Sequence, residues 1–183
     1  MANTKWIIDA AHSEVLFKVK HLMVTNVTGQ FSSFEGTVEA ENDDFSNATI
    51  QFTADVHSIS TNNEQRDQHL KTADFFEAEK YPQVKFVSTG FKKKSDEDYE
   101  LTGDLTIKGI TQQVSLKVEF SGIVQDPWGN TKAGFSLNGK INRKDFGLTF
   151  NAVTETGGVL LSDEVKLLAE VQLQKQAEVA QAA

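Results

Sequence analysis

The stretch NATIQFTADVHS, residues 47–58, alternates apolar and polar side chains almost without a break. A period of two places successive side chains on opposite faces of a β-strand. One face of this strand is therefore apolar, with Ile50, Phe52, Ala54 and Val56, while the other carries Gln51, Thr53 and Asp55. Strands of this kind are typical of an antiparallel sheet with one hydrophobic face and one face exposed to water.

The same pattern recurs along the chain and predicts eight main strands. They cover residues 13–24, 29–40, 47–58, 83–91, 99–107, 112–124, 132–141 and 164–173. The short segment Trp6-Ile7-Ile8 adds to the first of them, and a shift of phase between Phe31 and Phe34 predicts a bulge or bend near Ser32-Ser33. Eight antiparallel strands with a greasy interior are enough for a closed barrel that holds one ligand.

The composition of the chain excludes several other classes of protein. The chain has 183 residues, 39% of them hydrophobic, and a formal net charge of −8. We expect one domain, residues 1–175, and a flexible C-terminal tail, residues 176–183. The acidic balance argues against a nucleic-acid partner, and the lack of Cys excludes disulfides and thiolate chemistry. The first residues have neither a signal-peptide core nor a membrane span, which predicts a cytoplasmic protein, or a periplasmic one if a signal peptide has been removed.

The side chains predicted to point inward leave open whether the interior is solid or hollow. Small residues stand among large aromatic ones at these positions: Gly36, Ala54, Ser88, Gly103, Gly122, Gly139 and Ala169. If the barrel is hollow, its lining is apolar, and a long apolar molecule fits it. Each methylene group removed from water contributes roughly 0.8 kcal/mol to binding.

The longest interruption of the strand pattern, residues 61–82, is a polar and aromatic insert. Its Thr61-Asn62-Asn63-Glu64 has the spacing of a capping box, which predicts a short helix from Asn62 to about Leu70. Arg66 and His69 then share a helix face, where they could meet a phosphate or a carbonyl. In the alternative, Arg66 forms a salt bridge with Asp67 or Asp74 that pins the helix to the barrel. Further along the insert, Phe75-Phe76 offers an apolar plug.

Eight motifs appear in one order along the chain. They are Trp6-x-Ile8-Asp9-x-x-His12-Ser13, Phe17-x-Val19-x-His21, Gly29-x-Phe31-x-x-Phe34-x-Gly36, Arg66-Asp67-x-His69-Leu70, Asp74-Phe75-Phe76, Tyr81-Pro82-x-Val84-x-Phe86-x-Ser88-Thr89, Gly103-x-Leu105-Thr106-Ile107-x-Gly109 and Asn142-Arg143-x-Asp145-Phe146-Gly147. Together, from Trp6 to about Leu173, they resemble the YceI-like family of polyisoprenoid-binding proteins. The resemblance implies an all-β fold, an extended lipocalin-like eight-stranded antiparallel β-barrel with a short helical insert. It also implies a tunnel that holds an isoprenoid chain, such as a polyprenyl phosphate or a quinone, or another long amphiphile.

The resemblance also suggests residues for the ligand site. The candidates for the tunnel wall are Phe17, Val19, Phe31, Phe34, Phe52, Phe75, Phe86, Leu105, Phe135 and Phe146. The candidates for the polar end are His21, Arg66, His69 and Arg143. For Arg66 and Arg143, salt bridges with Asp67 and Asp145 remain the alternative. His12 is expected to make structural hydrogen bonds at a strand start.

Signals of catalysis are weak. None of the four histidines lies at His-x-His or His-x-x-x-His spacing, and no nucleophile elbow, phosphate-binding loop or dinucleotide fingerprint is present. We therefore predict a bacterial, non-catalytic carrier of a long-chain isoprenoid or similar lipid, with no metal, no cofactor and no stable membrane insertion. A homodimer is left open. The alternatives are a module that sequesters assorted hydrophobic molecules and a lipid hydrolase acting through His69 and Asp67.

Overall fold

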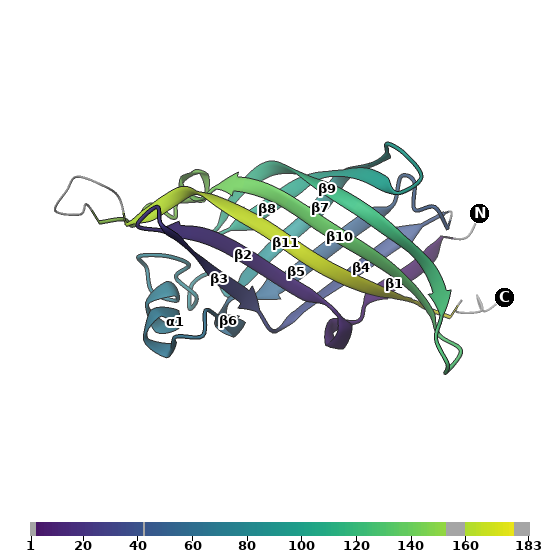
Figure 1. The fold of residues 1–183 in the computed structure, drawn as a ribbon, viewed down its shortest axis with the longest axis horizontal. Helices are drawn as coiled ribbons and strands as arrows, with labels where there is room; N and C mark the ends of the chain where they lie inside the picture. The colour runs from purple at the N-terminus through teal and green to yellow at the C-terminus, as the bar shows by residue number, and fades with distance from the viewer. Residues whose placement is uncertain (1–2, 42, 153–159, 178–183) are drawn as a thin grey trace.

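Eight antiparallel strands close into a ring in the computed structural model, which describes residues 3–41, 43–152 and 160–177 (Figure 1). Around the ring the order is β1 (Thr4–Ile8), β4 (Phe34–Ala40), β5 (Thr49–Asp55), β7 (Gln83–Lys93), β8 (Asp98–Ile107), β9 (Ile110–Gln125), β10 (Thr131–Asn142) and β11 (Leu161–Lys175), which pairs with β1 again. The predicted all-β, eight-stranded antiparallel barrel is confirmed.

Three further strands extend the barrel at one end. They are β2 (Glu14–His21), β3 (Thr25–Phe31) and β6 (Ile59–Ser60). Each continues a ring strand past a break: the 3₁₀ turn Ala10–His12 separates β1 from β2, Ser32-Ser33 separates β3 from β4, and the turn Val56–Ser58 separates β5 from β6. The bend predicted at Ser32-Ser33 is therefore confirmed. The predicted strand 47–58 is too long, because its last three residues form the 3₁₀ turn.

The first hairpin also differs from the prediction. The strand expected over residues 13–24 ends at His21, and the next one begins at Thr25 rather than at residue 29. Leu22 and Met23 have φ angles of 53° and 58°, which no strand residue adopts. Both side chains are apolar, so the pattern alone cannot distinguish this turn from more strand.

Two β-bulges change which side chains face inward. In β7 the register against β8 jumps between Ser88 and Gly90, and this brings Phe91 into the core with 4% of its surface exposed. In β9 the register against β10 skips Ser121, so that the inward phase passes from Phe120 to Ile123. The inward position predicted for Gly122 is therefore wrong, because one extra residue in a strand reverses the phase.

An aromatic cluster closes the barrel near its termini. Phe45, in the β4–β5 connection, is fully buried, and its ring centroid lies 5.1 Å from Trp6, 5.5 Å from Phe120 and 5.0 Å from Phe135. Such separations, with tilted and edge-on rings, are those of favourable aromatic pairs. We call these four residues the aromatic plug.

The helical insert lies at the opposite end from the two chain termini (Figure 1). It holds one α-helix, α1 (Glu64–Leu70), and no helix in the described residues is long and apolar enough to cross a membrane. At the other end the backbone N–H of Gln176 donates to the carbonyl of Lys5 (2.8 Å). Backbone pairing with β1 therefore continues one residue past β11, into the predicted tail. Residues 178–183 of that tail lie outside the described residues.

Candidate ligand-binding cavity

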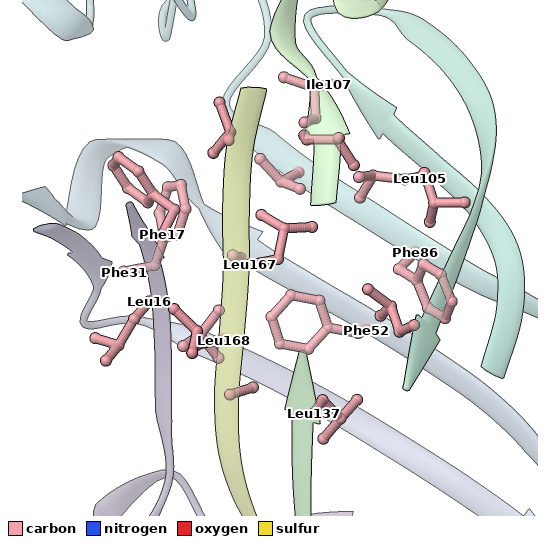
Figure 2. A pocket seen from close by; sticks show the side chains of 18 of the residues that line it. Leu16, Phe17, Phe31, Phe52, Phe86, Leu105, Ile107, Leu137, Leu167 and Leu168 are labelled. Atoms are coloured by element: carbon pink, nitrogen blue, oxygen red, sulfur yellow. The ribbon is translucent and has the colours of Figure 1, made fainter. Parts of the chain in front are cut away.

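The interior of the barrel is hollow. A cavity of about 510 Å³ lies between the inner faces of the strands, within the range of 300–1,000 Å³ that small-molecule sites occupy. Phe17 and Phe31 lie together on its wall, with ring centroids 5.8 Å apart, and Phe52 pairs with Phe86 on another part of it (Figure 2). The hollow alternative for the interior is therefore the correct one.

The lining is apolar for most of its length. Among the described residues that form it, the charged side chains are Arg66 and Arg143, and none is Asp, Glu or Lys. The strands contribute Phe, Leu, Val and Ile side chains, and the aromatic plug contributes Phe45 and Phe135. A ligand inside this cavity meets few hydrogen-bonding groups, so its body must be apolar.

Most of the predicted wall lines this cavity. Eight of the ten wall candidates do so: Phe17, Val19, Phe31, Phe52, Phe75, Phe86, Leu105 and Phe135. Phe34 does not, because it stands at the first position of β4 beside the break, where its ring packs 6.1 Å from that of Phe52. Phe146 does not either, since it belongs to the 3₁₀ turn Arg143–Phe146 and is buried in the core with 1% exposure.

All four candidates for the polar end line the cavity, and they lie toward one end of it. Arg143 donates to the carbonyl of Phe150 (2.8 Å), and the His69 ring lies edge-on to the Phe150 ring, 5.0 Å between centroids. His21 pairs in register with Leu161, next to Ser162, whose carbonyl also accepts from Arg143. Arg66 stands one helical turn before His69 on α1. These contacts place the polar groups at the α1 end, away from the aromatic plug.

Arg143 is the most buried charge of the cavity, with 3% of its surface exposed. Its Nε donates to Ser162 (2.9 Å), and its Nη1 donates to the carbonyls of Leu148 (2.6 Å) and Phe150 (2.8 Å). Its Nη2 is buried, has no hydrogen-bond partner among the residues that the structure describes, and lies 3.9 Å from a carboxylate oxygen of Asp163. The salt bridge proposed with Asp145 is therefore wrong, and the neighbouring carboxylate is that of Asp163.

Burial acts on the charge of Arg143. Desolvation lowers the pKa of its guanidinium below the ordinary value of arginine, and the nearby carboxylate of Asp163 opposes this effect. A guanidinium does not lose its proton in proteins near neutral pH. The cavity thus holds a buried positive charge with donor capacity to spare on Nη2.

Arg66 is held by Thr61 rather than by an acid. Its Nε donates to the Thr61 hydroxyl oxygen and its Nη2 to the Thr61 carbonyl, both at 2.7 Å. The Thr61 hydroxyl and N–H in turn donate to Asp67, at 2.6 and 2.8 Å. The direct Arg66 salt bridges with Asp67 or Asp74 are not the observed contacts. The helix also begins later than predicted, because Asn62 has a φ of 61° and Asn63 is the residue whose side chain accepts from the N–H of Arg66.

His69 packs between aromatic rings and an acid. Its Nε2 lies 2.9 Å from Asp74, and its ring meets Phe75 edge-on at 5.1 Å. Asp67, the acid that a hydrolase through His69 would use, is occupied by Thr61 instead. The described residues contain no group of three or more His, Cys, Asp or Glu that could hold a metal ion. His12 lies elsewhere, in the 3₁₀ turn between β1 and β2. Its Nδ1 is 2.9 Å from a carboxylate oxygen of Asp9, which confirms the structural hydrogen bond expected of this residue.

Several residues of the cavity were not predicted. Phe45 and Phe150 lie outside the strands, in segments without alternation, so no periodic signal marked them. Ile8 belongs to the short segment that was counted only as an addition to the first strand. A large aromatic residue within a polar loop, such as Phe45 in Glu41–Asn47, is the one signal in the sequence that singles out a plug.

Comparison with known proteins gives consistent matches over most of the chain. The model of the YceI-like domain matches residues 6–173. UPF0312 protein SAS2572 of Staphylococcus aureus (strain MSSA476) is 41% identical over 170 residues, which are 92% of this chain and 96% of the relative.

Solved structures share the barrel. BcnA of Burkholderia cenocepacia superposes with a TM-score of 0.76 and 26% identity, over 90% of this chain and 98% of its own. A polyisoprenoid binding domain from Saccharophagus degradans superposes with a TM-score of 0.69 over 93% of this chain and 98% of its own. At 12% identity that second likeness concerns the fold alone.

Proposed function

Since this chain belongs to the YceI-like family, whose domain model matches residues 6–173, we propose that it is a non-catalytic carrier of one long-chain isoprenoid lipid or similar amphiphile. The apolar tail lies along the barrel toward the aromatic plug, and the polar head lies at the α1 end near Arg143. A solved polyisoprenoid binding domain has the same barrel, so this fold is compatible with a ligand of that class.

The observation that carries the proposal is the hollow apolar interior. A cavity of about 510 Å³ whose described lining has no acid and no lysine does not suit a polar substrate. It suits a chain of methyl and methylene groups, each of which contributes roughly 0.8 kcal/mol on leaving water. Affinity therefore comes from chain length, and no covalent chemistry is needed.

The head group is proposed to be anionic or to carry a carbonyl oxygen. Arg143 lines the cavity, and no group in the described part of the chain accepts a hydrogen bond from its buried Nη2. A buried unpaired donor costs about 1–3 kcal/mol, and a ligand oxygen that accepts from it removes this cost. A phosphate or carboxylate oxygen adds the strength of a charge-assisted hydrogen bond.

The test is native mass spectrometry of the purified protein after incubation with a polyprenyl phosphate, followed by extraction of the bound species. We expect one lipid per chain. Two variants block the cavity: Phe86→Asp places a charge on its wall, and Ala169→Phe fills its space without adding a charge. Val87→Asp is the matched control, because Val87 directly follows the wall residue Phe86 in β7 but is 48% exposed and does not line the cavity.

The outcomes separate the alternatives. Loss of lipid in Phe86→Asp and Ala169→Phe, with normal lipid in Val87→Asp and unchanged circular dichroism, supports the proposal. Full uptake in Ala169→Phe would show that the lipid lies outside the barrel. Turnover of the head group that disappears in His69→Ala would instead indicate a lipid-modifying enzyme.

A second candidate is sequestration of assorted hydrophobic molecules. It is favoured by the same wall, because side chains without hydrogen-bonding groups discriminate poorly between apolar ligands of similar size. Competition of an alkyl phosphate against a polyprenyl phosphate of equal carbon number decides between the two. Equal affinities would favour sequestration, and a tenfold or greater preference for the isoprenoid would favour the carrier.

A further inference from the structure

The turn between β2 and β3 exposes three consecutive apolar side chains. Leu22 is 44% exposed, Met23 is 56% exposed and Val24 is 81% exposed. The N–H of Val24 donates to the carbonyl of His21 (3.1 Å), and the two central residues have φ angles of 53° and 58°. A turn with positive φ at both central positions favours Asn and Gly, and bulky side chains are strained there. Leu22 and Met23 therefore do not stabilise the fold, because their side chains are exposed to water and their backbone conformation is strained.

This turn, which we call the apolar tip, stands at the α1 end of the cavity. His21 lines the cavity and directly precedes the tip. The N–H of Leu22 donates to the carbonyl of Leu160 (2.8 Å), another residue of the lining. The tip is therefore at the end where the polar groups gather, and the aromatic plug is at the other end.

Lysines lie beside the tip on the outer face of the barrel. In the sheet register Lys140 of β10 is directly opposite Lys166 of β11, and Lys166 is directly opposite Lys18 of β2. Lys20 follows on the same face of β2, one residue before His21. We call these four residues the lysine row. Like charges directly opposite each other in a sheet are destabilising, and this row stands in a chain of formal net charge −8.

Few acids offset the lysine row. The Nζ of Lys140 lies 3.3 Å from Glu164, and the nearby Asp163 is 3.3 Å from Lys144 instead. Within residues 3–41, 43–152 and 160–177, Lys18, Lys20 and Lys166 have no carboxylate within 4.0 Å of Nζ. The row therefore presents positive charge next to the exposed apolar tip.

We propose that this end of the barrel docks on the surface of an anionic lipid bilayer, with the apolar tip inserted between head groups and the lysine row held against lipid phosphates. The combination of apolar side chains and adjacent lysines matches the two components of such a surface. Docking would bring the α1 end of the cavity to the membrane from which a lipid is taken or to which it is delivered. The inference rests on the proposed function, because only a membrane-derived cargo makes this contact useful.

The experiment measures binding of the purified protein to vesicles by cosedimentation. Vesicles of phosphatidylcholine with 30 mol% phosphatidylglycerol are compared with vesicles of phosphatidylcholine alone, at low and high salt. We expect the protein to bind the anionic vesicles at least tenfold more tightly than the neutral ones. Binding to the anionic vesicles should weaken as the salt concentration rises.

The test variant Leu22→Asn/Met23→Gly supplies the residues that this turn prefers. We expect at least a tenfold loss of binding together with an unchanged or higher melting temperature, so a folding defect cannot explain the loss. Lys18→Gln/Lys166→Gln is expected to weaken binding and to reduce its dependence on salt. Trp128→Ser is the matched control, because Trp128 is 83% exposed in the β9–β10 turn at the opposite end.

Three results would overturn the inference: equal binding to neutral and anionic vesicles, full binding by Leu22→Asn/Met23→Gly, or loss of binding in Trp128→Ser alone. Native mass spectrometry of the same samples distinguishes this failure from failure of the proposed function. If only docking is wrong, every one of these variants still carries one lipid per chain once it is loaded in detergent. If the carrier proposal is wrong, the wild-type protein carries none.

Discussion

The aromatic plug makes a quantitative prediction about Phe45. This side chain is fully buried and lies within 5.0–5.5 Å of three other rings, measured between centroids. Replacing a buried Phe by Ala removes its transfer free energy and leaves a cavity, at a typical cost of about 3–5 kcal/mol. Since domains of this size are stable by about 5–15 kcal/mol, Phe45→Ala should lose a large fraction of the free energy of unfolding.

The same substitution should change which ligand fits. Phe45 lines the cavity, so loss of its ring lengthens the space at the closed end. The ring removed is comparable in size with one five-carbon isoprene unit. If the added unit is fully buried, it contributes up to about 4 kcal/mol, at about 0.8 kcal/mol for each carbon. We therefore expect Phe45→Ala to shift its preference to chains longer by about one isoprene unit.

Two assays check these statements. Urea unfolding followed by circular dichroism gives the free energy of unfolding, with Phe45→Leu as a control that keeps an apolar side chain at the same positive φ of 61°. Native mass spectrometry with a series of polyprenyl phosphates gives the preferred chain length. A loss below 1 kcal/mol, or an unchanged length preference in a folded Phe45→Ala protein, would refute the idea that Phe45 closes the cavity.

Two further predictions concern the barrel itself. Gly103→Ala should lower the free energy of unfolding by about 1–3 kcal/mol, because the new Cβ would stand 2.6 Å from the carbonyl oxygen of Val87. In the control Gly134→Ala the nearest atom is at 3.5 Å, so urea unfolding should show almost no change. Similar losses in both variants would contradict this reasoning. Asp9→Asn should cost about 3 kcal/mol at pH 7, because it leaves the Lys132 ammonium, whose side chain is 10% exposed, without its carboxylate partner at 2.8 Å. The hydrogen bond from Lys132 lowers the pKa of Asp9 below 3.8. The stability that this carboxylate contributes is therefore fully present above pH 3.8 and is lost as the pH falls through the lower pKa of the folded state. The free energies of unfolding of Asp9→Asn and wild type should converge below pH 3.8, and a constant difference would argue against the ion pair.

Local pattern was sufficient for most of the fold. Alternation with a period of two depends only on neighbouring residues, and it predicted seven of the eight ring strands. The eighth, β1, was counted only as an addition to the predicted strand 13–24, and a shift of phase predicted the bend at Ser32-Ser33. The site residues came from motifs whose order along the chain resembles a family, and the four polar candidates do line one end of the cavity. Failures came where local pattern is ambiguous: apolar Leu22 and Met23 resemble strand residues, and a one-residue bulge at Ser121 has no marker in the alternation.

The sequence by itself determined that this chain forms an antiparallel barrel with one apolar face, because side-chain alternation follows from the backbone geometry of each strand alone. Only the tertiary structure decided that the barrel is hollow, that Phe45 closes one end and that Arg143 lies buried near Asp163 rather than beside Asp145. These features depend on contacts between segments far apart in the chain, such as Phe45 with Phe135. The volume left between packed side chains is a property of all the strands together, so no single stretch of sequence encodes it.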